Sequence, residues 1–263
     1  MKKLLIVSGD SFSDKNFQTM VHPEMDTSWP KWPELLAKKL DMECINVANS
    51  GYGNDYIYES ILETIHNTDK DRIGLVIAGW SQAQRKTWQV SKYLRWQNRR
   101  YDLDGDIFGW TKRSLRYYLS FQILCERYNL PYFHFQTIPL FSAWLYGLYP
   151  EDFKIRKNML NPDPNFVDRM TYPGDREEDN IELEKMILDF EKNIDTNKFI
   201  GWPAGIGRLG GYCIEHRTTR YDDERGRIKE LTISRYDSHP NAKGQEVIAK
   251  FIYERLQKRI SSK

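Results

Sequence analysis

Short apolar runs rich in β-branched residues recur along the chain, and polar or glycine-containing stretches follow them. Runs of this length are typical of buried strands in a parallel sheet, where both faces of each strand are covered. Between them, apolar residues recur at helical spacing. We predict strands at residues 4–7, 44–48, 73–78 and 132–137, and helices that begin near 33 and span about 56–66, 114–128, 175–193 and 244–256.

The order of these elements indicates an α/β fold. The helix predicted at 114–128 stops at Asn129-Leu130-Pro131, and a strand follows at once, which is the repeating unit of a doubly wound sheet. The chain has 263 residues. We predict a single domain over 1–263 with an insertion of uncertain structure at about 139–230.

Polar residues that suit catalysis follow the first strand. The sequence Ser8-Gly9-Asp10-Ser11 comes directly after the apolar run at 4–7. Ligands of open parallel sheets bind outside the carboxyl ends of the strands, so Ser11 is well placed to act as a nucleophile. A serine nucleophile needs a base, a group that orients the base, and donors for an oxyanion.

The missing base is found near the other end of the chain. Asp237-Ser238-His239-Pro240-Asn241 precedes the last predicted helix, and His239 is the candidate base. Together with Gly9-Asp10-Ser11-Phe12-Ser13, this segment resembles the SGNH (GDSL-type) hydrolases. That resemblance implies a three-layer α/β/α sandwich with a mostly parallel, flavodoxin-like sheet, and serine esterase or acyl-transfer activity. Taken singly, Ser11 also fits a helix N-cap and His239 an ordinary loop histidine.

The resemblance extends to the stretch after the second strand. Asn46-Val47-Ala48-Asn49-Ser50-Gly51 is similar to the family's second sequence block, which implies that the backbone N–H groups of Ser11 and Gly51 form the oxyanion hole. The third block departs from the family pattern, because Ser81 and Gln82 stand where Asn and Asp are usual. Ser81, or the side-chain amide of Asn54 or Gln82, is then the candidate third donor. Substrate-binding candidates at this strand end are Trp80, Gln82 and Arg85.

The acid of the predicted triad is also displaced. The family usually places Asp three residues before His, where this chain has Tyr236, while Asp237 lies two before His239. We expect a loop here, in which a shift of one residue changes where a side chain points. Either Asp237 still orients His239, or the site works as a Ser–His dyad with a backbone carbonyl as the orienting group.

Composition and charge exclude several classes of function. The net charge of +2 arises from 39 basic and 37 acidic residues, which does not point to nucleic acid; a basic, aromatic stretch at 95–100 is the remote exception. The three cysteines, which are Cys44, Cys125 and Cys213, are widely separated, so we expect no disulfide framework, metal site or cofactor. The first apolar run is too short for a signal peptide or a membrane span, so we expect a cytoplasmic protein.

Two other segments and two histidines receive structural interpretations. Residues 87–100 are interpreted as a helical or lid-like excursion, and the glycine-rich stretch 200–211 as a flexible rim of the active site. His134 lies in the middle of a predicted strand between aromatic residues, so we expect a buried, hydrogen-bonded histidine. His22 lies in a polar loop and is interpreted as solvated.

Two functions remain open on the sequence. The first is an esterase or acyl-transferring enzyme that acts through Ser11, His239 and Asp237 on a small or glycan ester, with an O-acetylated sugar as one candidate. The second is an SGNH-like binding or structural protein whose catalysis is weakened by the departures at Ser81 and Tyr236.

Overall fold

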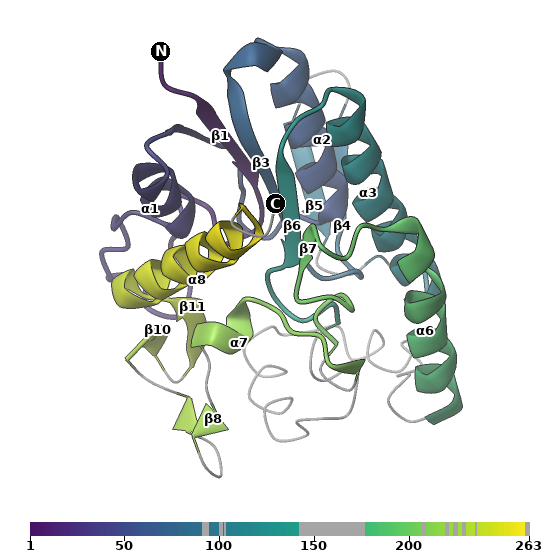
Figure 1. Cartoon of the computed structure of the whole chain (residues 1–263). Coiled ribbons are helices and arrows are strands. Elements are labelled where there is room, and N and C mark those ends of the chain that lie inside the picture. Colours follow the sequence, from purple (N-terminus) through teal and green to yellow (C-terminus); the bar gives the residue numbers. More distant parts are fainter. Residues whose placement is uncertain are drawn as a thin grey trace.

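A five-stranded, all-parallel sheet forms the centre of the molecule (Figure 1), with the strand order β2-β1-β3-β6-β7. In this computed structural model the described residues are 1–90, 95–99, 102, 104–141, 177–206, 209–218, 221–222, 226–227, 230–234 and 236–260. The strands are β1 (Leu4–Ser8), β2 (Glu43–Asn46), β3 (Ile73–Trp80), β6 (Tyr132–Gln136) and β7 (Phe199–Ile200).

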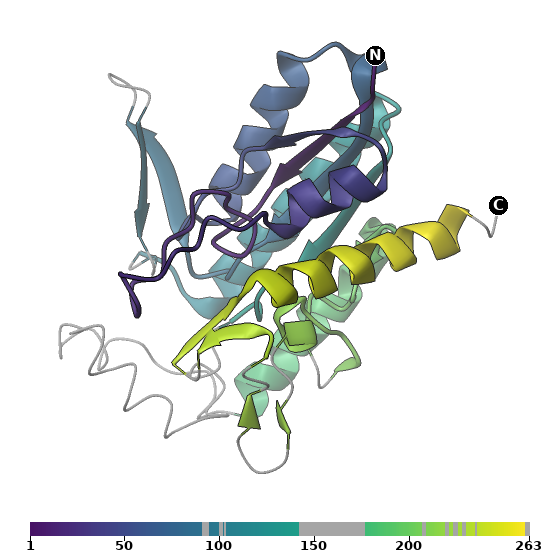
Figure 2. The same cartoon turned by 90° about the vertical axis from the view of Figure 1, so that its left-hand side faces the viewer.

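Helices cover both faces of this sheet (Figures 1 and 2). One face is packed by α1 (Trp32–Lys39) and α8 (Ala242–Ile260), and the other by α2 (Asn54–His66), α3 (Ile107–Arg127) and α6 (Glu177–Asp189). The remaining described elements are short: 3₁₀ turns at Lys70–Arg72 and Glu191–Asn193, helix α7 (Glu215–Thr218), and the two-stranded pairs β4 (Lys86–Val90) with β5 (Arg95–Arg99), β8 (Tyr221–Asp222) with β9 (Gly226–Arg227), and β10 (Thr232–Ser234) with β11 (Asp237–Pro240).

The central strand β1 shows why the sequence folds into layers. Its side chains alternate between the two faces, so Leu5 and Val7 pack with α1 and α8, whereas Ile6 packs with α2. All three are fully buried, as expected for a strand covered on both sides. The predicted three-layer α/β/α sandwich with a flavodoxin-like strand order is therefore confirmed.

Two segments differ from their predicted structure. Of the helical or lid-like excursion predicted at 87–100, the described residues form no helix: β4 and β5 pair as antiparallel strands that stand out from the body of the molecule (Figure 2). The edge strand β7 was not predicted, because two residues are too few to be recognised from their composition; it overlaps the glycine-rich stretch 200–211 only at Ile200. Of the predicted insertion, residues 142–176 lie outside the described residues.

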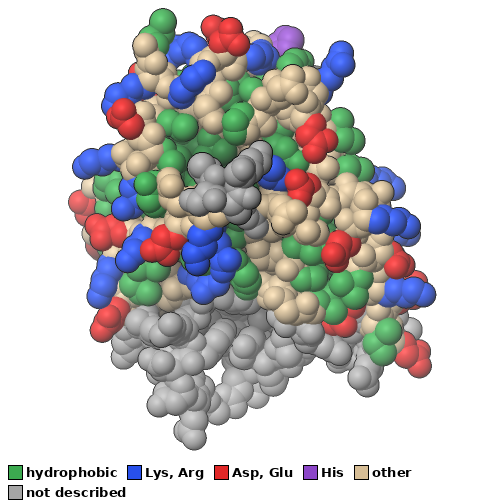
Figure 3. Space-filling view, in the orientation of Figure 1, with side chains coloured by type: hydrophobic (Ala, Val, Ile, Leu, Met, Phe, Trp, Pro, Cys, Tyr) green, Lys and Arg blue, Asp and Glu red, His purple; other side chains and the backbone are tan. Residues whose placement is uncertain are grey.

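Charged side chains of both signs are scattered over the face drawn in Figure 3, outside its grey atoms. This agrees with a net charge of only +2, and the face drawn carries no single-sign stripe of the kind that follows a nucleic-acid backbone. Among the described helices, none combines the length and the apolar composition needed to cross a bilayer.

His134 lies in β6 and is fully buried among aromatic rings. Its Nδ1 accepts a hydrogen bond from Trp80 Nε1 at 3.2 Å, but its Nε2 has no partner among the described residues. The predicted buried histidine is thus confirmed, with only one of its two nitrogens hydrogen-bonded. Burial lowers the pKa of His134 to about 3, because the charged imidazolium would lose its hydration.

The buried, neutral His134 should make the stability of the fold sensitive to acid. Below pH 6.5 the unfolded chain protonates His134 while the folded chain does not, so the free energy of unfolding falls by about 1.4 kcal/mol per pH unit down to about pH 3. His134→Gln keeps an acceptor for Trp80 and removes this contribution to the slope. Urea denaturation between pH 4 and 7 measures it, and equal slopes for the two proteins would contradict the assignment.

Candidate active site

Ser11 lies in a single tight turn at the carboxyl end of the central strand β1. The backbone N–H groups of Ser13 and Asp14 donate to the carbonyl of Asp10, at 2.9 and 3.0 Å, which closes the turn around Ser11. A Cβ atom on Gly9 would come within 2.6 Å of Ser13 Oγ, so a larger residue does not fit at the start of the turn. The sheet thereby fixes the position of the Ser11 hydroxyl.

A continuous chain of hydrogen bonds joins Ser11 to residues more than 220 positions away. Ser11 Oγ lies 2.8 Å from His239 Nε2, and His239 Nδ1 lies 2.5 Å from Asp237 Oδ1. Asp237 is buried, and the side chain of His239 is 29% exposed. The predicted nucleophile, base and acid are therefore brought together in the order that acyl transfer requires.

The two-residue spacing of Asp237 and His239 follows from a strand that the sequence analysis missed. Both residues belong to β11, which pairs with β10 in an antiparallel ribbon, so the loop expected here is wrong. Side chains two positions apart in a strand point to the same side. Asp237 and His239 therefore share one face, and Ser238 between them points away.

Several contacts hold Asp237 in place and keep it ionised. The hydroxyl of Thr19 donates to Asp237 Oδ2, and the backbone N–H of Asp237 donates to Ser234 Oγ at 3.1 Å. Burial alone would raise the pKa of the Asp237 carboxyl, but the hydrogen bond and charge of His239 together with the Thr19 hydroxyl lower it to about 2. The ring of His239 also stacks on the ring of Phe17, with 4.4 Å between the two centroids.

Two backbone donors face no protein acceptor. Within the described part of the chain, the N–H groups of Ser11 and Gly51 make no hydrogen bond to another protein atom. Gly51 has φ +81°, a left-handed conformation that favours glycine. The carboxylate of Asp14 holds this turn against the Ser11 loop, because its Oδ2 accepts from the N–H and the hydroxyl of Ser50 at 3.0 and 2.6 Å.

The side chains predicted as further oxyanion donors have other roles. The Asn54 carboxamide is buried between Ser81 and Ser114: its Oδ1 accepts from the N–H of Ser81 at 2.8 Å, and its Nδ2 donates to Ser114 Oγ at 3.0 Å. The Ser81 hydroxyl is fully buried. It faces the carboxylate of Asp10, but the two groups do not form a hydrogen bond. Asn54 therefore braces the end of β3, and we leave it out of the candidate oxyanion hole.

The three tentative substrate-binding residues occupy different positions. Trp80 is fully buried in the helix-covered core, so its assignment to substrate binding is wrong. Gln82 is partly exposed, and its Oε1 accepts from Gln84 Nε2 at 3.1 Å. Arg85 lies beside the site, with one guanidinium nitrogen 3.5 Å from the carbonyl of Tyr52.

A buried carboxylate adjoins Ser11. Asp10 has no exposed surface, and burial raises its pKa, while the charge of Arg85 opposes that shift. The two side chains are 4.0 Å apart between guanidinium nitrogen and Oδ2, too long for a direct hydrogen bond. One Asp10 oxygen instead accepts from the N–H of Phe12 at 3.1 Å, which helps to shape the Ser11 turn.

The sequence predicted no role for three residues that contact the site, which are Thr19, Phe17 and Asp14. Thr19 and Phe17 lie in the polar stretch after Ser11, and their contacts with the Asp237–His239 pair span more than 200 residues, so no local pattern signals them. Asp14 stood next to the motif without a distinguishing feature. His22, interpreted as solvated, is instead 2.7 Å from Ser234 Oγ through its Nε2.

The described side chains offer no evident metal site. No group of three or more His, Cys, Asp or Glu among them is arranged to hold a metal ion. Cys125 and Cys213 are buried and Cys44 is partly buried; all three are free thiols.

Fold and site together define an α/β/α protein with a Ser-His-Asp constellation at the carboxyl end of its parallel sheet. No family model and no curated protein matches the chain. Among solved structures, a G-D-S-L family protein from Desulfitobacterium hafniense DCB-2 is similar at TM-score 0.48 and 11% identity, over 97% of this chain and 99% of its own.

Two further solved structures are similar at the same level. The psychrotrophic esterase EstA from Pseudoalteromonas sp. has a TM-score of 0.45 and 12% identity, over 98% of this chain and 99% of its own. A carbohydrate esterase family 2 enzyme from Corynascus thermopiles (Myceliophthora fergusii) has a TM-score of 0.41 and 14% identity, over 98% of this chain and 67% of its own. At these identities function has to be argued from the site itself.

Proposed function

We propose that this protein is a serine ester hydrolase of SGNH type, with Ser11 as nucleophile, His239 as general base and Asp237 as the group that orients His239. The observation that carries the proposal is the unbroken hydrogen-bond chain from Ser11 Oγ through both ring nitrogens of His239 to a buried carboxylate. A base must lie within hydrogen-bond reach of the proton it removes, and 2.8 Å meets that requirement.

The geometry supports a two-step acyl transfer. His239 Nε2 takes the proton of Ser11 Oγ as the oxygen attacks the ester carbonyl carbon, and the carbonyl oxygen becomes an oxyanion facing the N–H groups of Ser11 and Gly51. The bond from carbon to the leaving alkoxide then breaks, and His239 returns its proton to that alkoxide. Water repeats the sequence on the acyl-enzyme and releases the acid; a hydroxyl of another molecule in its place would make the reaction a transfer.

Small or glycan esters suit this site, and an O-acetylated sugar is our leading candidate. Tyr52 directly follows Gly51, and its hydroxyl donates to the carbonyl of Trp96 at 3.4 Å; both residues are partly exposed. Exposed aromatic faces beside a hydroxyl-activating centre suit an alcohol portion with apolar ring faces and polar edges. Arg85 is our candidate for contacting a polar group of that alcohol.

One observation favours a different function, a binding protein with weakened catalysis. The position that would supply a third, side-chain oxyanion donor is held by Ser81, whose hydroxyl is fully buried. Loss of one such donor typically lowers turnover by about 100- to 1,000-fold.

Reaction with a fluorophosphonate distinguishes the two functions. We expect the intact protein to gain the mass of one phosphonyl group within minutes, because the probe needs only an activated serine and the two backbone donors. His239→Ala should not react on this timescale, since Ser11 then has no base. A wild-type protein that stays unlabelled at high probe concentration would support the binding function and reject the esterase.

A further inference from the structure

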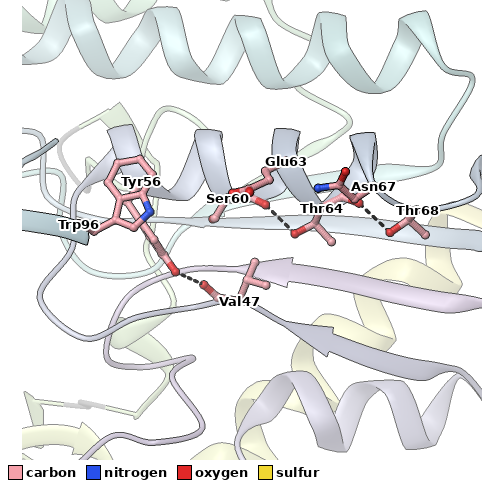
Figure 4. Close-up of a pocket in the computed structure, with 8 residues that line it drawn as sticks. All are labelled: Val47, Tyr56, Ser60, Glu63, Thr64, Asn67, Thr68 and Trp96. Carbon is pink, nitrogen blue, oxygen red and sulfur yellow. Dashed lines mark hydrogen bonds between the residues drawn. The ribbon is translucent and has the colours of Figure 1, made fainter. Parts of the chain in front are cut away.

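A hollow lies between helix α2 and the edge strand β2 (Figure 4). Its volume is about 390 Å³, which falls in the range of small-molecule sites. Val47 at the end of β2 and Trp96 of β5 line one end, and polar residues of α2 line the rest. Figure 4 shows Thr64 and Thr68 on the side of α2 that faces the strands. We call this hollow the α2 groove.

The α2 groove begins next to the candidate oxyanion loop. Tyr52 directly follows Gly51, and its ring meets that of Tyr56 edge to face at a centroid distance of 4.6 Å. Tyr56 in turn meets Trp96 at 5.1 Å, and its hydroxyl donates to the carbonyl of Val47 at 2.9 Å. The aromatic end of the groove is thus continuous with the loop that carries Gly51.

Polar side chains with unused hydrogen-bonding capacity continue along the groove. Glu63 and Asn67 are exposed, and neither side chain has a hydrogen-bond partner within the described part of the chain. They are four positions apart, so they lie one above the other on the helix. The hydroxyl of Thr64 donates to the carbonyl of Ser60 at 2.6 Å, which leaves its oxygen free to accept. From Tyr56 to His66, where α2 ends, the helix rises by about 15 Å.

From these features we infer that the α2 groove binds a neutral oligosaccharide, and, on the proposed esterase function, that this is the glycan chain of the ester substrate. Aromatic faces stack on the apolar faces of sugar rings, and carboxylate, carboxamide and hydroxyl groups pair with sugar hydroxyls. No Lys or Arg lines the groove among the described residues, and Glu63 disfavours an anionic ligand. An extended peptide is disfavoured because, of the described residues that line the groove, Val47 alone has an aliphatic side chain.

Binding of unesterified tetrasaccharides tests the inference separately from catalysis. Isothermal titration calorimetry of the full-length protein with xylotetraose and with cellotetraose measures the affinity without any ester being present. The double variant Glu63→Ala/Asn67→Ala removes two hydrogen-bonding groups and should weaken binding about tenfold. Glu59→Ala/His66→Ala, on exposed positions of the same helix outside the groove, is the matched control and should bind like the wild type.

The aromatic end has its own pair of variants. Trp96→Ala should abolish measurable binding of the tetrasaccharide, and Trp96→Phe should restore it, because a flat ring is retained. The inference is overturned if neither tetrasaccharide binds, if the Glu63→Ala/Asn67→Ala protein binds as tightly as the wild type, or if an extended peptide occupies the groove instead. The binding experiment uses no ester, so it can fail independently of the proposed esterase function. Tetrasaccharide binding by a protein whose Ser11 does not react with the fluorophosphonate would support the groove and reject the esterase. Labelling of Ser11 in a protein that binds neither tetrasaccharide would support the esterase and reject the groove.

Discussion

Ser11→Ala is expected to reduce the hydrolysis of p-nitrophenyl acetate by on the order of 10⁶-fold, or to the rate of buffer alone. The variant keeps the turn and the backbone donors but lacks the oxygen that attacks the ester. The substrate is small and activated, so its hydrolysis depends little on contacts with the alcohol portion.

The matched control for this variant is Ser238→Ala. Ser238 lies between Asp237 and His239 on β11, and strand alternation turns its side chain away from them. We expect its activity to stay within about twofold of wild type, and circular dichroism should show all three proteins folded. Equal rates for wild type and Ser11→Ala, above the rate of buffer, would place the activity elsewhere.

Asp237→Asn is expected to lower kcat by about 10⁴-fold while the protein stays folded. The carboxamide has the same shape, but it does not stabilise the imidazolium that forms when His239 takes the proton, and its amide group favours the wrong histidine tautomer. Because the pKa of Asp237 is about 2, the wild-type carboxylate stays ionised above about pH 4. Between pH 5 and 8, titration of Asp237 should therefore cause no change in the ratio of the wild-type rate to the variant rate.

The size of this effect also decides between a triad and a dyad. If a backbone carbonyl oriented His239 instead, Asp237→Asn would cost less than about tenfold. The contact at 2.5 Å between Asp237 Oδ1 and His239 Nδ1 favours the triad. A small loss of activity, measured with p-nitrophenyl acetate under saturating conditions, would contradict that assignment.

The central sheet and the position of the candidate nucleophile were predictable because their signals are local. The runs at 4–7, 73–78 and 132–137 contain enough apolar, β-branched or aromatic residues to reveal buried strands, and Ser11 lies in the short polar stretch that follows the first of them. The position of Gly51 after β2 was equally readable. Such features depend on a few neighbouring residues and on the rule that parallel strands place their carboxyl ends at one edge.

The geometry of the acid was not predictable in the same way. Asp237-Ser238-His239-Pro240 lacks the residues enriched in strands, so we expected a loop, yet pairing with β10 makes it extended. That extended backbone places the side chains of Asp237 and His239, two positions apart, on the same side. Thr19, which donates to Asp237, is 218 residues away in sequence, and only the folded chain brings the two together.

Trp80 shows a signal that was present but not used. Side chains of β3 alternate, and Ala78 and Trp80 lie on the same side, both in the core that α2 and α3 cover. Counting by twos from the buried middle of the strand would have placed Trp80 in the core rather than in the site. By contrast, the inward turn of the Asn54 carboxamide depends on Ser114 of α3, which no local pattern reveals.

The most direct test of the central claim is to locate the fluorophosphonate adduct by peptide mass spectrometry. Trypsin should release residues 4–15, a peptide that contains Ser8, Ser11 and Ser13, and fragment ions distinguish the three. We predict that the phosphonyl group is on Ser11 and that Ser11→Ala yields the corresponding peptide, with Ala at position 11, unmodified. An adduct on any other residue, or none on the folded wild-type protein, would contradict the assignment of Ser11 as the nucleophile.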